Sequence, residues 1–485
     1  MNFWPELSLP VQHAFQSING MLLLLVLGHQ LAPHWRRLLT SDRWGGSAQS
    51  GFVTDLLHRP ALAPMILVSW AGCAVALICD WQSILASAIN VALCRYYFVA
   101  MRWRGVGRGY GAPGFMTYWL SVAVLLLAVA RLHAPSVQPL AIFWLQVDLA
   151  LIIFSSGIYK LRSGYRLGEG MDYGLVNPMW SYWPDFFRKL PTSHPVFRFL
   201  NQSAWISQLV STVLMLLPVT RWLGGLAEMA TYLFIATQIR LGWLAEQMML
   251  TGLLFFTVGS PAGRWWDAHW SVPGQFTGAS HGASAILVIS LQTLLWLQLI
   301  LTPLCHAGLF FNYYGRRRLP APLQRLLDAY ANFFGIIIWR VFSVDHLNFH
   351  VNVHHAAPAG GTRILLSKWS APGDLRFWHV GEAITVTSLF TTLKYYPADS
   401  ALFRDRVFRY AQTLSCPAGH DLIFSYHAIR KVDGRYADRL VCEYHVNPRA
   451  KTMRIIALEE DFSAAAAHGT SPLHPGTRPG SYAPA

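Results

Sequence analysis

The stretch SAILVISLQTLLWLQLILTPLCHAGLFF, residues 284–311, contains no aspartate, glutamate, lysine or arginine. A helix of about 20 mostly apolar residues is long enough to cross the hydrocarbon core of a bilayer, because each residue adds about 1.5 Å along the axis. The segment therefore predicts a transmembrane helix, and the chain is expected to be an integral membrane protein.

The composition of the whole chain also indicates a membrane protein. Of its 485 residues, 53% are hydrophobic and only 13% are charged, whereas about a quarter are charged in a typical soluble protein. We expect a mostly α-helical, polytopic transmembrane bundle of about nine spans, with the lipid bilayer as its partner. The nine predicted spans cover about residues 14–33, 61–79, 82–101, 115–133, 139–159, 203–220, 225–244, 245–260 and 284–311.

The formal charge of +14 follows from where the basic residues lie. With nine spans, all the basic clusters fall on one side of the membrane, which the positive-inside rule identifies as the cytoplasm. Nucleic acid is therefore not needed as a partner. The N-terminus is expected outside and the C-terminal region inside, in a plasma or inner membrane. The clusters comprise Arg36, Arg37, Arg43 and Arg59; Arg102, Arg104 and Arg108; Lys160, Arg162, Arg166, Arg188 and Lys189; and Arg316, Arg317 and Arg318.

From about Ser343 the composition changes to that of a small cytoplasmic α/β domain. Two runs of alternating apolar and polar residues, Leu422 to Val432 and Arg439 to Val446, are joined by Asp433-Gly434, a strong signal for a tight hairpin. An apolar stripe predicts a helix over residues 400–415. The chain thus divides into a transmembrane domain (1–342), a soluble α/β domain (343–463) and a disordered tail (464–485).

The fifth predicted span carries the candidate site. Asp148 lies near its middle, where a carboxylate is costly and normally faces a partner or a wet cavity. Tyr159 lies on the same helix face, and Lys160 follows at the membrane boundary. Lys160 would be a base if it were desolvated, or a snorkelling side chain that sets topology. We predict that Asp148, Tyr159, Lys160 and Glu169 line one cavity near this boundary.

The motif SGIYKLRSG at residues 156–164, followed by Gly168-Glu169-Gly170, resembles the HTTM domain, the membrane domain of vitamin K-dependent gamma-carboxylases. A later stretch with Asn177-Pro178 is also similar to lipase maturation factors. The resemblance covers about residues 140–260. It implies that Lys160 corresponds to the lysine that deprotonates reduced vitamin K, and that a reduced quinone is the cofactor.

The histidine cluster at residues 346–355 is a single group, whereas membrane di-iron enzymes need several separated ones. Its alternation predicts a strand with His350 and His354 on the polar face. Cys442 and His445 have the sequence spacing of a pair of zinc ligands, but on a strand their side chains would point to opposite faces. We therefore expect no metal site.

Two hypotheses for function stay open. The first is an HTTM-type enzyme that uses Lys160 as a base on a lipophilic or quinone-like cofactor. The second is a non-catalytic membrane factor that binds a lipid or another lipophilic small molecule, or assists the maturation of a client protein. A transporter is a third reading, weakened because the sequence shows no internal repeat.

The predicted topology can be tested with reporter fusions. A fluorescent protein that matures only in the cytoplasm should be bright when fused after Leu458, because nine spans and an outer N-terminus place this end inside. A fusion in the loop at residues 134–138 is the matched control and should be dark. A secreted phosphatase that is active at the C-terminal position would contradict the topology.

Overall fold

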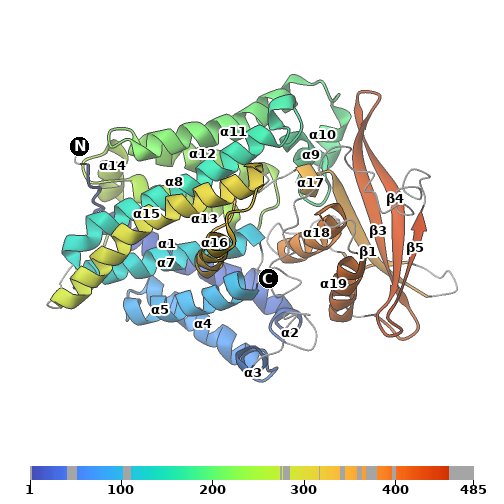
Figure 1. The fold of residues 1–485 in the computed structure, drawn as a ribbon, viewed down its shortest axis with the longest axis horizontal. Coiled ribbons are helices and arrows are strands. Elements are labelled where there is room, and N and C mark those ends of the chain that lie inside the picture. The colour runs from blue at the N-terminus through green and yellow to red at the C-terminus, as the bar shows by residue number, and fades with distance from the viewer. Residues whose placement is uncertain are drawn as a thin grey trace.

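The computed structural model describes residues 3–40, 52–101, 111–272, 276, 284–315, 317–338, 344–357, 363–367, 379–395, 400–414 and 416–457. A bundle of helices forms one end of the molecule and an antiparallel sheet forms the other (Figure 1). The predicted tail at 464–485, the basic cluster at Arg102, Arg104 and Arg108, and the domain boundary at Ser343 lie outside these residues.

Each of the nine predicted spans coincides with a helix. The helices that coincide with these spans are α1 (Leu9–Val26), α4 (Leu62–Ile78), α5 (Ser83–Cys94), α7 (Gly111–His133), α8 (Gln138–Arg162), α11 (Pro195–Leu216), α12 (Arg221–Gln238), α13 (Leu244–Thr251) and α15 (Ala285–Gly315). The connecting helices are α2 (Trp35–Leu38), α3 (Phe52–Leu57), α9 (Met171–Val176), α10 (Pro184–Lys189), α14 (Pro261–His269), α16 (Ala321–Phe334) and α17 (Val344–Leu347).

Within the described ranges, five continuous helical segments are long and apolar enough to cross a membrane, which is compatible with a multi-pass membrane protein. They are Leu9–Leu31, Ser83–Ala100, Gly111–His133, Pro135–Arg162 and Ala285–Gly315. The count of nine spans is not confirmed. Helices α4 and α13 are shorter than the length needed to cross a membrane. Helices α11 and α12 are long enough, but their polar residues make their mean hydropathy too low.

Helix α8 packs against α7, α11 and α15. Gly157 permits its close approach to α11: a Cβ atom at this position would lie 2.8 Å from the side chain of Leu209. Small residues at helix interfaces allow such contacts in membranes. The outer face of α15, in contrast, is rich in exposed aliphatic side chains, as expected of a surface in contact with lipid.

The C-terminal sheet has five antiparallel strands in the order β2-β1-β3-β4-β5. The strands are β1 (Phe349–Ala356), β2 (Ile364–Leu365), β3 (Asp421–Val432), β4 (Arg435–Asn447) and β5 (Thr452–Ala457). The predicted hairpin is confirmed, and Asp433 and Gly434 both have positive φ angles, 47° and 73°. Two such residues form the turn whose twist matches the two strands.

Helices α18 (Val380–Tyr395) and α19 (Ser400–Thr413) cover one face of this sheet (Figure 1). Helix α19 confirms the helix predicted over residues 400–415. Phe390 of α18 is 1% exposed and packs against aromatic rings of α19, β3 and β4. The sheet and two helices therefore share one apolar core.

A buried carboxylate fastens the opposite face of the sheet to the helical bundle. Asp172 in the first turn of α9 is 0% exposed. Its Oδ2 atom accepts a hydrogen bond of 2.7 Å from the Tyr436 hydroxyl and lies 3.0 Å from Lys431 Nζ. Its Oδ1 atom accepts hydrogen bonds from the Gly170 amide (2.6 Å) and from Asn201 of α11 (3.2 Å). One side chain thus joins two helices and both strands of the hairpin.

The substitution Tyr436→Phe tests this attachment. Loss of a hydrogen bond to a buried charged group should weaken the docking of the sheet by about 1.5–3 kcal/mol. We expect faster backbone hydrogen exchange in α9 and in the first residues of β4. The control is Tyr444→Phe, on the opposite face of β4 against Phe390; it should leave exchange in α9 unchanged. Equal exchange in α9 for Tyr436→Phe and the parent protein would contradict the role of the contact.

Candidate functional site

Lys160, the predicted base, lies in the interior of the bundle. Its side chain is 4% exposed, and its Nζ atom donates hydrogen bonds to Ser156 Oγ (2.7 Å) and to Gln208 Oε1 of α11 (2.9 Å). It also interacts electrostatically with Glu228 of α12, which is 0% exposed. The hydrogen bond to Gln208 links α8 to α11, whereas neither carboxylate oxygen of Glu228 has a hydrogen-bond partner among the described residues.

The structure does not bring the four predicted site residues into one cavity. Asp148 opens into a pocket that does not include the other three. Tyr159 is buried, with its ring 6.1 Å from that of Tyr313 on α15. Glu169 is exposed beyond the end of α8. The prediction considered only the face of one helix, whereas the side chains of neighbouring helices determine the contacts of each residue.

The pocket around Asp148 lies between α7, α8 and α15 and is completed by the chain that follows α16. Aromatic and aliphatic side chains form most of its wall, with four polar side chains among them. The lining residues are Phe115, Tyr118, Trp119, Val122, Trp144, Asp148, Ile152, Gln298, Thr302, His306, Phe334, Ile336 and Ile337. We call this the Asp148 pocket.

Polar atoms of the Asp148 pocket without a hydrogen-bond partner among the described residues include one donor, Trp144 Nε1, and two acceptors, Asp148 Oδ1 and His306 Nε2. Trp119 Nε1 donates a hydrogen bond of 2.7 Å to Asp148 Oδ2, which leaves Oδ1 without one. His306 Nδ1 lies 3.1 Å from the carbonyl oxygen of Thr302, so Nδ1 carries the proton there and Nε2 is an acceptor. The pocket therefore offers two hydrogen-bond acceptors within an apolar wall.

The polar residues that α15 contributes to this pocket were missed in the sequence. Gln298, Thr302 and His306 follow one another at intervals of four residues, which places them on one face of α15. This polar stripe in the most apolar stretch of the chain was the available signal. Trp119 had no such signal, because its partner Asp148 lies on another helix.

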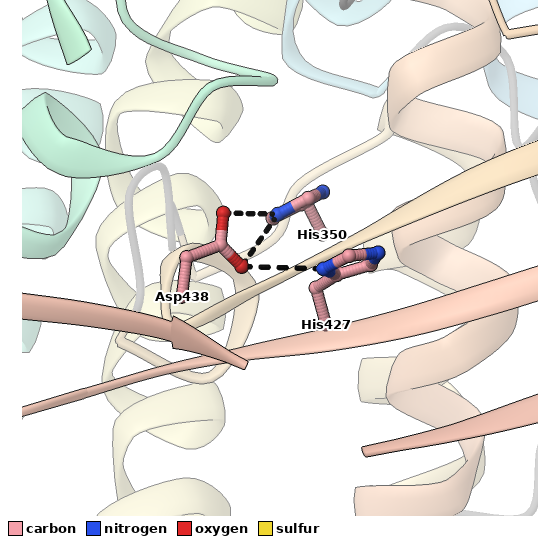
Figure 2. Close-up of side chains that lie close together, drawn as sticks. All are labelled: His350, His427 and Asp438. Carbon is pink, nitrogen blue, oxygen red and sulfur yellow. Dashed lines mark hydrogen bonds and ion pairs between the residues drawn. The ribbon is translucent and has the colours of Figure 1, made fainter. Parts of the chain in front are cut away.

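A second cluster lies on the sheet face that is attached to the bundle. Figure 2 shows the carboxylate of Asp438 on β4 beside the imidazole rings of His350 on β1 and His427 on β3, facing both of them. His350 Nε2 lies 2.9 Å from Asp438 Oδ2, and His427 Nδ1 lies 3.3 Å from Oδ1. The two rings are stacked with their centroids 4.5 Å apart. His350 lies on the predicted strand, but His427 and Asp438 were not recognised.

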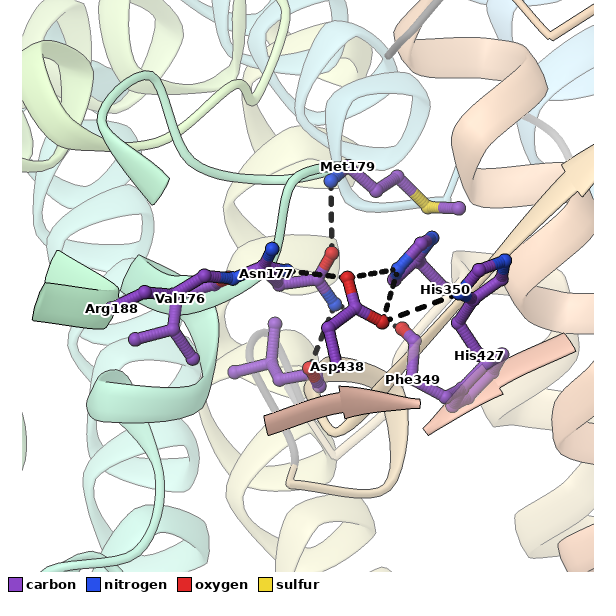
Figure 3. Close-up of polar contacts among 9 residues, drawn as sticks. Val176, Asn177, Met179, Arg188, Phe349, His350, His427 and Asp438 are labelled. Atoms are coloured by element: carbon purple, nitrogen blue, oxygen red, sulfur yellow. Dashed lines mark hydrogen bonds and ion pairs between the residues drawn. The ribbon is translucent and has the colours of Figure 1, made fainter. Parts of the chain in front are cut away.

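Helix α10 and the loop before it hold this cluster against the bundle (Figure 3). Arg188 donates one hydrogen bond to Asp438 Oδ2 (2.7 Å) and another to the carbonyl oxygen of Val176 (2.8 Å). Asn177, part of the motif similar to lipase maturation factors, donates to the carbonyl oxygens of Leu347 (2.7 Å) and Phe349 (2.8 Å). In this structure Asn177 positions the start of β1.

These contacts fix the charge state of the cluster. Burial by itself would raise the pKa of Asp438, but hydrogen bonds from His350 and His427 and the charge of Arg188 outweigh it and hold the pKa well below its usual range. Burial lowers the pKa of His350, against the opposing effect of Asp438. At neutral pH the cluster therefore contains an ionised carboxylate that faces a neutral His350.

Comparison of the chain with family models, with curated proteins and with solved structures found no match. The resemblance of residues 140–260 to the HTTM domain stays a prediction, and so does a catalytic role for Lys160.

The contacts of Lys160 predict how its replacement acts. Lys160→Met should destabilise the protein by about 1–3 kcal/mol, because it leaves the buried acceptors Ser156 Oγ and Gln208 Oε1 without their donor and removes the positive charge that acts on Glu228. The double variant Lys160→Met, Glu228→Gln should recover the part of this loss that comes from the charge of Glu228. Thermal unfolding in detergent measures both. If Lys160→Met is as stable as the parent protein, the interaction with Glu228 is not structural.

Proposed function

We propose that this multi-pass membrane protein binds a lipophilic molecule that carries a hydroxyl group, of which a quinol is one example, in the Asp148 pocket. The observation that supports the proposal is the pair of unpartnered acceptors, Asp148 Oδ1 and His306 Nε2, in a wall of aromatic and aliphatic side chains. Ligand sites are typically apolar pockets with a few converging polar groups.

The chemistry of the two acceptors selects the class of ligand. A carboxylate in a membrane-spanning helix is costly unless it has partners, and Trp119 supplies only one of them. A phenolic or alcoholic hydroxyl would donate to the remaining oxygen or to His306 Nε2, while its apolar body would contact the rings of Tyr118, Trp144 and Phe334. An oxidised quinone has only acceptors: it could accept from Trp144 Nε1, but it would leave both Asp148 Oδ1 and His306 Nε2 unpaired.

This proposal favours the binding function over the enzyme with Lys160 as its base. Lys160 does not line the Asp148 pocket, and its amine already donates to Ser156 and Gln208. Any proton transfer to or from a molecule in this pocket would use Asp148 or His306. The HTTM-type carboxylase reading therefore has no support from the contacts of the lysine.

Binding of a short-chain quinol tests the proposal. The purified protein in detergent should bind decylubiquinol more tightly than decylubiquinone, because only the reduced form donates hydrogen bonds. Asp148→Asn should weaken quinol binding about ten-fold or more, as expected for the loss of a charged acceptor. Equilibrium dialysis measures the affinities, and mass spectrometry of lipophilic molecules that co-purify with the protein identifies a resident ligand.

The matched control is Asp328→Asn. Asp328 is exposed on α16, the helix whose last residue lines the pocket, and it is not itself part of the wall. This variant should bind decylubiquinol as the parent protein does. Equal quinol affinities for the parent protein and Asp148→Asn, with no co-purifying lipophilic molecule, would refute the proposal.

A further inference from the structure

We propose that His350, His427 and Asp438 form a binding site for a divalent transition-metal ion such as Zn²⁺ or Fe²⁺. The site lies on the C-terminal sheet and is independent of the Asp148 pocket. Two imidazoles and one carboxylate are a ligand set that proteins use for zinc and for non-haem iron, with the remaining positions open to water or another ligand.

The distances between the ligand atoms fit such an ion. Two atoms bound to one metal at about 2.0–2.1 Å lie about 2.9 Å apart at a right angle and about 3.3 Å apart at a tetrahedral angle. Asp438 Oδ1 lies 3.0 Å from His350 Nε2 and 3.3 Å from His427 Nδ1. One ligand atom from each residue lies within 4.8 Å of the other two, so small side-chain rotations would complete the site.

A β-bulge places the three side chains on the same face of the sheet. Between Tyr426 and His427 the register of β3 and β4 shifts by one residue. With the bulge, Asp438 pairs with Ile429, two residues from His427, so both side chains point to one face. Without it, Asp438 would point to the opposite face, because side chains alternate along a strand. Bulges often redirect a side chain in this way.

The surroundings hold the ligands in place and leave access from solvent. Arg188 donates to Asp438 Oδ2 and positions the carboxylate, as partners of ligating carboxylates commonly do. The side chain of His350 is 4% exposed, whereas those of His427 and Asp438 are 23% and 20% exposed. A metal ion could therefore enter from the side of His427 and replace the protons that now face Asp438.

Cobalt binding to the full-length protein in detergent tests the site. After treatment with a chelator, the protein should bind one equivalent of Co²⁺ per chain, with visible absorption bands that Zn²⁺ abolishes by competition. His427→Ala should weaken binding at least ten-fold. This is the most informative variant, because it keeps the hydrogen bond between Arg188 and Asp438 that attaches the sheet. Asp438→Asn provides a second test through a different ligand.

The control is His445→Ala. His445 lies on β4, on the same face of the sheet, and its partner is Glu443. This variant should bind one equivalent of Co²⁺ with the parent affinity. Thermal unfolding without metal should be similar for His427→Ala and His445→Ala, which separates loss of a ligand from loss of the fold. The proposal is overturned if the parent protein binds no stoichiometric metal, if both ligand variants retain it, or if His445→Ala loses it equally.

Discussion

The arrangement of this protein depends on one buried carboxylate, that of Asp172. It lies in the segment that follows helix α8, and it binds Asn201 of α11 as well as Lys431 and Tyr436 of the hairpin. A buried charge is stable only when its partners surround it. The contacts of Asp172 therefore fix the position of the sheet. In this position His350 and Asp438 lie close to Arg188 on α10.

Local signals in the sequence predicted the elements well. The nine predicted apolar spans all coincide with helices. In a helix the backbone N–H and C=O groups of an apolar segment bond to one another and need no water. Asp433-Gly434 produces the hairpin because both residues tolerate positive φ angles. The number of membrane-spanning helices was harder to predict. Helices such as α11 and α12 are long, but polar residues that pack inside the bundle lower their hydropathy.

The sites were only partly predictable, because they join residues that are distant in the sequence. Asp148 stood out in the sequence as a carboxylate within an apolar helix, yet its partner Trp119 and its neighbour His306 belong to other helices. Lys160 was expected near these residues, but the close approach of α11 at Gly157 gives it Gln208 instead. On the sheet, no pattern in the sequence announces the bulge that aligns Asp438 with His427.

The contact between Asp172 and Tyr436 also has a consequence for how the chain is made. The two residues are 264 positions apart, and a ribosome that adds about 5–20 residues per second needs about 15–50 s to pass from one to the other. Throughout that interval the carboxylate lacks its hairpin partners, although α8 is complete before the interval begins and α11 is synthesised early in it. The final orientation of α9 is thus set late in biogenesis, when the end of the polypeptide emerges.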